Sequence, residues 1–435
     1  MKDHLKAEGI EIYSWAKDLF PICRSITGNG VRDTLKYIKN IVPELVVHEV
    51  PSGTKAFDWT VPDEWNIKEA FIEDTYGNRL VDFADNNLHV LNYSIPVDKV
   101  ISLETLQKHL YSIPDRPNAI PYMTSYYERN WGFCISHKQR QSLKPGNYRV
   151  CIDSTLRAGH LTYGEIVIPG RLKKEVFLST YICHPSLANN EISGPVVTAA
   201  LSRWLANNPK MKYSYRIVFG PETIGAIVYI SRNLEKLKKR VISGFNVSCI
   251  GDNNTYTFLA SRNGKTLADR VAKHVLYHTD KDYKAYTFLD RGSDERQYCA
   301  PGVDLPMASI MRTRYGDYPE YHSSDDNLDF ISPEGLEGGF EALVKSINVI
   351  EKNQVLKPTQ ICEPQLGKRK LISNLGLGTK PMDLARKDVS NLLAFSDGET
   401  DLLDIAVKIE RPMWELIETV EILKSEGLLV EVGEN

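Results

Sequence analysis

The chain has 435 residues, which is more than one compact core usually holds, so we expect two or three domains. Its formal net charge of −3 at pH 7 gives no electrostatic reason to expect a nucleic acid as partner. The seven cysteines are an odd number without a C-x-x-C pair, which favours reduced thiols over disulfides. Without a signal-like start or an apolar run of about 20 residues, the sequence predicts a cytoplasmic protein that does not enter a membrane.

The first third of the chain begins with helical patterns and continues with β-like patterns. Apolar residues at helical spacing predict a helix over residues 5–20, ended by Pro21, and a second helix over residues 31–41. From residue 59 to residue 158, short β-like runs alternate with turn signals, and we interpret this segment as a β-rich inserted domain. Its aromatic cluster, between Tyr122 and Phe133, either roofs a substrate cleft or forms a core between domains.

Strands and helices alternate in the middle of the chain. The predicted strands cover residues 176–182, 213–219 and 241–250, and the predicted helices cover residues 193–207, 222–238, 264–277 and 333–352. Such alternation predicts an α/β sheet with helices on both faces. We assign residues 1–58 and 159–355 to this domain.

The last part of the chain, residues 365–435, has the element order of a winged helix. We expect helices over residues 400–409 and 413–425, followed by a strand over residues 428–432. Residues 391–435 carry eleven acidic and three basic side chains, whereas phosphate binding needs positive charge. We therefore favour a packing role or a subunit contact over DNA binding, and a homo-oligomer stays open. The apolar face expected to meet a partner consists of Leu416, Val420 and Leu423.

Four residues of the types that zinc hydrolases use stand far apart in the chain. His184, Glu222 and Asp252 each come after a strand-like run, and His322 lies in a later stretch. In open α/β sheets ligands bind beyond the carboxyl ends of the strands, so such residues can meet at one point. Imidazole and carboxylate groups hold zinc with one position open for water, and a nearby carboxylate serves as general base. The pattern predicts a metal-dependent hydrolase.

These residues belong to longer runs that resemble the co-catalytic zinc aminopeptidases. The runs are His184–Gly194, Pro221–Gly225, Asp252, Gly292–Glu295 and Tyr321–Asp325. More closely, the chain resembles a bacterial family of aminopeptidase-like proteins that is often encoded with polysaccharide biosynthesis genes. Arg24–Gly28 and Tyr126–Cys134 also resemble motifs of that family. The resemblance implies a zinc-aminopeptidase-like mixed sheet flanked by helices, a nested domain of unknown function and a carboxyl-terminal winged helix.

The resemblance also implies roles for the four residues. It places His184 and Asp252 on the ligands of one zinc ion, His322 on a ligand of a second ion, and Glu222 on the general base. A zinc ion that polarises the carbonyl and activates water is chemically sufficient for hydrolysis even when it is alone.

Two positions depart from the pattern of the two-zinc aminopeptidases. Asn190 stands where an aspartate bridges both ions, and Thr223 stands where a second glutamate is usual. A neutral amide brings no charge to hold two dications together. We therefore expect one zinc ion, held by His184 and Asp252, with His322 or Asn190 as a further ligand.

Four charged residues are candidates for substrate binding. Arg24 and Arg129 could grip a carboxylate in bidentate geometry, or form surface salt bridges instead. Asp294 and Glu295 could orient a ligand imidazole or hold a substrate amine, and a solvated acidic turn is the alternative.

The sequence therefore predicts a zinc-dependent hydrolase that cleaves an amide of a small peptide or an aminoacylated or N-acylated sugar. The alternative is a binding or scaffold protein, linked to polysaccharide biosynthesis, that keeps the fold but has lost hydrolysis. Asn190 and Thr223 support this alternative. A regulator that senses a ligand through its winged helix is the weakest option on charge grounds.

Overall fold

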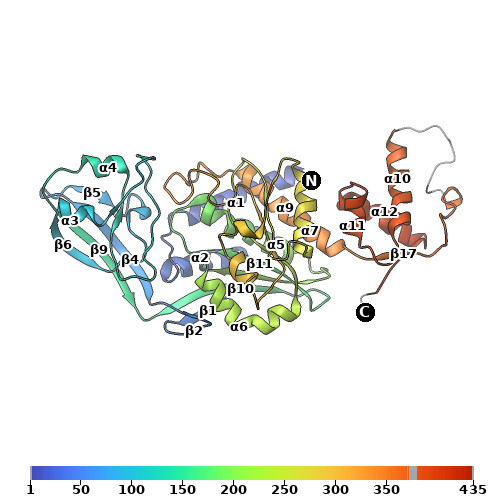
Figure 1. Cartoon of the computed structure of the whole chain (residues 1–435), viewed down its shortest axis with the longest axis horizontal. Helices are drawn as coiled ribbons and strands as arrows, with labels where there is room; N and C mark the ends of the chain where they lie inside the picture. Colours follow the sequence, from blue (N-terminus) through green and yellow to red (C-terminus); the bar gives the residue numbers. More distant parts are fainter. Residues whose placement is uncertain (1, 370, 372–379, 434–435) are drawn as a thin grey trace. The chain divides into compact units, whose positions relative to one another are not determined.

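The computed structural model describes residues 2–369, 371 and 380–433 (Figure 1). The chain forms two compact units. The first runs through Asp269 and resumes over Asp282–Glu341, and the second comprises Arg270–Lys281 and the chain from Ala342 onward. No helix in the described residues combines the length and the apolar character needed to cross a bilayer.

An eight-stranded mixed sheet forms the centre of the first unit, with the strand order β1-β10-β12-β11-β13-β16-β14-β15. Its strands are β1 (Val46–Pro51), β10 (His160–Ile168), β11 (Glu175–Tyr181), β12 (Ser214–Gly220), β13 (Val241–Asn246), β14 (Thr257–Leu259), β15 (Lys284–Tyr286) and β16 (Met307–Met311). The four central strands β12, β11, β13 and β16 are parallel, and all seven residues of β11 are buried. The carboxyl ends of these strands therefore share one edge of the sheet.

Helices cover both faces of this sheet, as the sequence predicts. In the first unit they are α1 (Lys2–Leu19), α2 (Asn29–Ile41), α5 (Ser193–Ala206), α6 (Ile224–Arg240) and α8 (Glu295–Tyr298). Helices α7 (Leu267–Thr279) and α9 (Pro333–Lys352) are each divided between the two units. Helix α5 connects β11 to β12, and α6 leads from β12 back past β11 to β13. Because parallel crossovers are right-handed, these two opposite steps place α5 and α6 on opposite faces of the sheet. Helices α1 and α2 pack on α5.

The third predicted strand is shorter than its apolar run. Residues 241–250 were expected to form one strand, but β13 ends at Asn246. Val247 donates one more hydrogen bond to the β11 residue Ser179, and the backbone then turns at Cys249, whose φ is 49°. Asp252 thus lies six residues beyond the strand, farther from its end than the sequence suggests.

The inserted segment is rich in β structure, as predicted. Its main sheet is antiparallel with the order β5-β4-β9-β6, and its strands are β4 (Glu64–Glu73), β5 (Arg79–Asp82), β6 (Val97–Ser102) and β9 (Asn147–Arg157). Short elements complete it: β3 (Trp59–Thr60), α3 (Leu103–Gln107), β7 (Leu110–Tyr111), β8 (Phe133–Cys134) and α4 (His137–Ser142). The boundaries at residues 59 and 158 stay a prediction.

The carboxyl-terminal region contains α10 (Lys380–Phe395), α11 (Leu402–Lys408), α12 (Met413–Ser425), and the strands β17 (Leu356–Pro358) and β18 (Leu429–Glu431). Strand β17 pairs with β18, so a start at residue 365 leaves out one strand of the wing. The apolar face of α12 does not point to a partner, because Leu416, Val420 and Leu423 are buried within the unit, where α12 packs on α10 and α11. Residues 370, 372–379 and 434–435, within the predicted winged-helix segment, lie outside the described residues.

Candidate functional site

The predicted site residues come from the loops at the carboxyl edge of the central sheet. His184 lies three residues after β11, and Glu222 lies two residues after β12. His322 comes from the long loop between β16 and α9. The ring centres of His184 and His322 are 5.6 Å apart, so residues from separate loops do converge.

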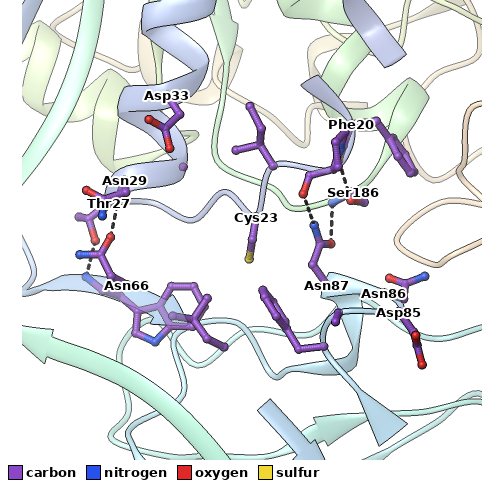
Figure 2. Close-up of a pocket in the computed structure, with 17 residues that line it drawn as sticks. Phe20, Cys23, Thr27, Asn29, Asp33, Asn66, Asp85, Asn86, Asn87 and Ser186 are labelled. Atoms are coloured by element: carbon purple, nitrogen blue, oxygen red, sulfur yellow. Dashed lines mark hydrogen bonds between the residues drawn. The ribbon is translucent and has the colours of Figure 1, made fainter. Parts of the chain in front are cut away.

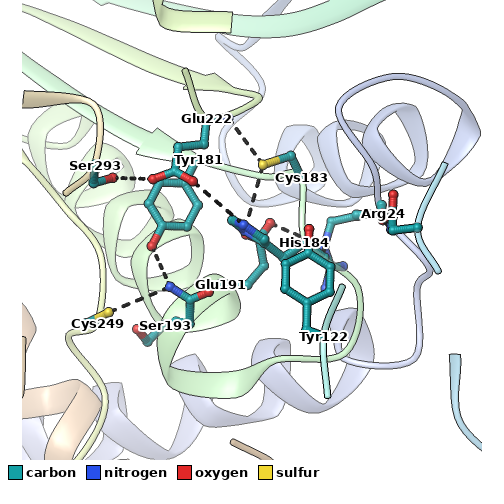
Figure 3. Close-up of polar contacts among 12 residues, drawn as sticks. Arg24, Tyr122, Tyr181, Cys183, His184, Glu191, Ser193, Glu222, Cys249 and Ser293 are labelled. Carbon is teal, nitrogen blue, oxygen red and sulfur yellow. Dashed lines mark hydrogen bonds and ion pairs between the residues drawn. The ribbon is translucent and has the colours of Figure 1, made fainter. Parts of the chain in front are cut away.

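Each ring nitrogen of His184 has a carboxylate near it. Nδ1 lies 2.6 Å from an oxygen of Glu191, and Nε2 faces a carboxylate oxygen of Glu222 at 3.7 Å (Figure 3). Burial alone would lower the pKa of His184, but the Glu191 and Glu222 carboxylates raise it above its usual value.

Glu222 is fixed by its neighbours at the tip of the β12 loop. The Ser293 hydroxyl donates to one carboxylate oxygen at 2.7 Å, and the Glu222 backbone N–H points at the Cys183 sulfur at 3.2 Å. Burial raises the pKa of Glu222, and the nearby His184 only partly opposes this. Thr223, the next residue, has a φ of 61°, which is strained for a β-branched side chain. Such strain is common where a fold fixes a functional group.

His322 is positioned by the inserted segment. Its φ is 55°, and its carbonyl oxygen accepts a hydrogen bond from the Tyr122 backbone N–H at 2.8 Å. The Tyr122 ring stands edge-on to both imidazoles, with ring centres 5.0 Å from His184 and 5.1 Å from His322. Burial, with His184 nearby, lowers the pKa of His322 to about 3, so the ring is neutral at physiological pH. Its buried Nε2 atom has no hydrogen-bond partner among the described residues.

Asn190 faces the same site from a π-helical turn over Ala188–Ile192. Its side-chain amide donates to the Tyr181 hydroxyl at 2.9 Å, and its backbone N–H donates to Asp326 at 3.0 Å. Its carbonyl oxygen, Oδ1, is buried and has no partner in the part of the chain that the structure describes. Buried polar atoms without partners are rare, and an ion is one explanation for them.

The residues fit a metal ion on these grounds. His322 Nε2 and Asn190 Oδ1 are both buried and unpaired, and His184 Nε2 faces the carboxylate of Glu222. Zinc–nitrogen bonds are about 2 Å long, which allows both imidazoles to reach one ion across their 5.6 Å ring separation.

Asp252, the other expected ligand, does not fit. Its two carboxylate oxygens accept four hydrogen bonds, from Asn189, from Asn254 and from both the N–H and the hydroxyl of Thr313. A carboxylate has about four lone-pair sites, so these donors use its capacity. Asp252 therefore ties the loop after β13 to the residues around it, and the structure corrects its predicted role.

Cys183, His184 and Glu191 also offer ligand atoms within 4.8 Å of one another. Two contacts of Glu191 and the raised pKa of Cys183 make this trio a weaker ligand set. Glu191 already holds His184 Nδ1 and pairs with Arg24, whose nitrogen lies 3.5 Å away. Burial, together with the nearby Glu191 and Glu222 carboxylates, raises the pKa of the Cys183 thiol well above its usual value, whereas zinc binds the thiolate.

Three of the four predicted substrate-binding residues lie beside the site, but groups of the protein itself engage them. Arg24 has an exposed fraction of 0%, and its side chain is engaged by His184, Leu19 and Glu191. Glu295 is buried and accepts bonds from Gly292, Ser293 and Tyr315, so it builds the loop. Asp294 is buried and accepts the Thr223 N–H at 2.7 Å. Arg129 is exposed, and among the described residues no hydrogen bond or ion pair joins it to the site.

Several residues that shape the site were not assigned a role from the sequence. Glu191 and Ser293 lie inside the recognised motifs, but their contacts depend on a turn and a loop that sequence patterns do not show. Asp326 directly follows another motif and accepts bonds from the backbones of Asn189 and Asn190.

A separate cavity of about 530 Å³ lies between the α1–α2 loop and the inserted segment (Figure 2). It is lined by residues 20–23, 65–67 and 83–87 among others, and its charged lining residues are Asp33 and Asp85. None of the imidazoles lines it, so it is not the metal site.

Comparison with known proteins identifies the family of the chain. Residues 13–353 match the family described as a domain of unknown function (DUF4910). The chain belongs to the DUF4910 family. Residues 354–431 match a winged helix-turn-helix family. A relative from Clostridium acetobutylicum is 45% identical over 403 residues, which cover 92% of this chain and 91% of the relative. It is provisionally named a polysaccharide biosynthesis protein with an aminopeptidase-like domain.

Solved structures show the same fold in this DUF4910 protein and its relatives. A crystal structure from Clostridium acetobutylicum, provisionally described as a peptidase, has a TM-score of 0.93 and 41% identity, covering 99% of this chain and 98% of its own. A zinc aminopeptidase from Bacillus subtilis has a TM-score of 0.56 and 14% identity, and the match covers 79% of this chain and 94% of that structure. A peptidase M28 precursor from Shewanella amazonensis has the same TM-score and identity, and the match covers 80% of this chain and 95% of that structure. The predicted aminopeptidase-like fold and winged helix are thus confirmed.

Proposed function

We propose that this DUF4910 protein is a zinc-dependent hydrolase that cleaves an amide bond of a small peptide or of an aminoacylated or N-acylated sugar. The observation that carries the proposal is the meeting of two imidazoles, His184 and His322, with the carboxylate of Glu222 at the carboxyl edge of the sheet. The zinc aminopeptidase among the structures of similar fold supports the choice of metal.

Different residues of the protein would bind the metal and transfer the proton during hydrolysis. His184, His322 and Asn190 would hold zinc, which supplies Lewis-acid polarisation of a carbonyl and lowers the pKa of water. Glu222 would accept the proton of the attacking water and deliver it to the leaving amine. Its raised pKa suits a group that must both take and release a proton near neutral pH.

The charges around the site favour one ion over two. Glu222 is the carboxylate that faces His184 Nε2, while Glu191 is balanced by Arg24 and Asp252 is occupied by four donors. Asn190 brings no charge, so a second dication would face too little negative charge to offset its desolvation.

The inserted segment would restrict the substrate to small molecules. Tyr122 covers both imidazoles edge-on, and its hydroxyl is bonded to that of Tyr126 at 2.6 Å. The Ser324 N–H donates to the Ile120 carbonyl, and the Ile120 N–H donates to the Ser324 hydroxyl. These bonds join this segment to the His322 loop, which leaves less room over the site for a long chain.

The second candidate is a binding or scaffold protein linked to polysaccharide biosynthesis. The engaged carboxylate of Asp252 favours it, because the site then lacks a carboxylate ligand that the aminopeptidase resemblance implies. The provisional name of the Clostridium relative points to the same process.

Metal analysis and a substrate panel separate these candidates. We expect the purified protein to hold about one zinc ion per chain and to cleave members of a panel of aminoacyl and N-acyl amides. Glu222→Gln should lose turnover by at least about 100-fold while keeping the ion, because it removes the proton carrier alone. Absence of stoichiometric zinc together with absence of cleavage would favour the binding protein.

A further inference from the structure

The buried carboxylate of Glu191 has no role in the hydrolysis proposed above, yet it makes a short contact with His184. One of its oxygens lies 2.6 Å from Nδ1 of the imidazole. The π-helical turn over Ala188–Ile192 brings the side chain back to a ring seven positions earlier in the chain (Figure 3). Glu191 has an exposed fraction of 0%, so water does not share this contact.

Arg24 supplies the charge that balances this carboxylate. Its Nε atom lies 3.5 Å from the second oxygen of Glu191 and also donates to the His184 carbonyl at 2.9 Å. Its Nη1 atom donates to the Leu19 carbonyl at 2.8 Å. A buried carboxylate is costly unless it is paired, so Arg24 allows Glu191 to remain charged in the interior.

We propose that Glu191, paired with Arg24, is the positioning residue that keeps the His184 proton on Nδ1 and leaves the lone pair on Nε2. The inference rests on the proposed function, because Nε2 is then the nitrogen presented to zinc. An ionised carboxylate only accepts hydrogen bonds, so its partner at 2.6 Å must be the protonated nitrogen. The partner of one ring nitrogen decides which state the other adopts, and this sets how well the ring binds metal.

The fold offers a matched control for this role. Glu175, at the start of the same strand β11, is a buried glutamate that accepts bonds from Arg216 at 2.6 and 3.1 Å. Glu191→Gln and Glu175→Gln each remove one charge from a buried arginine pair without changing side-chain volume much. Only the first alters the partner of His184.

The first measurement is zinc affinity, by competition with a chromophoric chelator, on the full chain. We expect Glu191→Gln to weaken zinc binding by about 10- to 100-fold. Glu175→Gln should lose stability in a denaturant titration but keep the affinity of the unmodified protein. An equal loss of affinity in both variants, or none in Glu191→Gln, would overturn the proposal.

The second measurement needs neither zinc nor a substitution at Glu191. Two-bond ¹H–¹⁵N NMR on histidine-labelled, metal-free protein, at a pH above the pKa of the His184 imidazole, reports which nitrogen carries the proton. His184→Gln assigns the signal. We expect His184 to be protonated on Nδ1, and a proton on Nε2 would refute the inference. If the protein binds no zinc but shows the Nδ1 proton, the hydrolase proposal fails and the role of Glu191 in orienting His184 stands.

Discussion

The two imidazoles of the candidate site are held in different ways. His184 follows β11, a fully buried strand that pairs on one side with β12 and on the other with β13. His322 lies in a long loop, has a φ of 55°, and is fixed by a backbone bond to Tyr122 of the inserted segment.

This difference indicates which half of the site is built into the sheet and which half is assembled around it. The His184 half keeps its geometry as long as the sheet is folded, since strand pairing is among the most stable parts of a domain. The His322 half depends on contacts of its loop with residues 120–122, on the bonds of Asp326 to the backbones of Asn189 and Asn190, and on the ion itself. The predictions below test this contrast.

Removal of either imidazole should have the largest effect. His184→Asn and His322→Asn should each weaken zinc binding by more than about 100-fold, because even the loss of a residue that only orients a ligand costs 10- to 100-fold. Both variants should stay folded, since neither ring is part of the strands. Chelator competition and circular dichroism check this. Retention of one zinc ion per chain by either variant would exclude that histidine as a ligand.

Asp252→Asn should reduce stability and leave the zinc content unchanged. Asparagine replaces one acceptor oxygen by an amide that cannot accept from Thr313 or Asn254, and each buried group left unpaired costs about 1–3 kcal/mol. Chemical denaturation measures the loss, and elemental analysis measures the metal. Loss of zinc with unchanged stability would instead restore Asp252 as a ligand.

The helices and strands that lead to the site were largely predictable from the sequence. The apolar, β-branched runs before His184 and Glu222 match β11 and β12 within one residue at each end, and the helix predicted over residues 333–352 matches α9. Such runs are informative because a parallel strand buried on both faces requires apolar residues throughout.

Roles that depend on packing between distant segments could not be predicted. Arg24 was expected to bind substrate, but its buried side chain pairs with the carboxylate of Glu191. Glu191 is 167 residues away in the chain and reaches Arg24 from a π-helical turn. Asp252 was expected to bind zinc because its apolar run resembles a strand to its end, whereas the chain leaves the sheet at Asn246. Residue type alone does not show whether a carboxylate is already engaged.

Tyr122→Ala should weaken the half of the site that the inserted segment holds. It removes two edge-on ring contacts, each worth about 0.5–1.5 kcal/mol, so zinc affinity should fall by roughly 10-fold. Tyr122→Phe is the matched control, because it keeps the ring and loses only the hydroxyl bond to Tyr126. If both variants lose the same affinity, the hydroxyl and not the ring supports His322. Chelator competition on the two variants decides this.

Zinc removal should produce the smallest and most local change. Without the ion, the His322 loop loses one of the groups that hold it and keeps its contacts with protein alone. The amides of Tyr122 and Ser324, which bond to His322 and Ile120, should therefore exchange hydrogen several-fold faster. The amide of Ile182, which bonds to Gly220 beside the central strands, should not change. Hydrogen–deuterium exchange with and without chelator measures both regions in one sample. Equal acceleration at Ile182 would show that the ion also holds the sheet edge, and the contrast between the two halves would then be wrong.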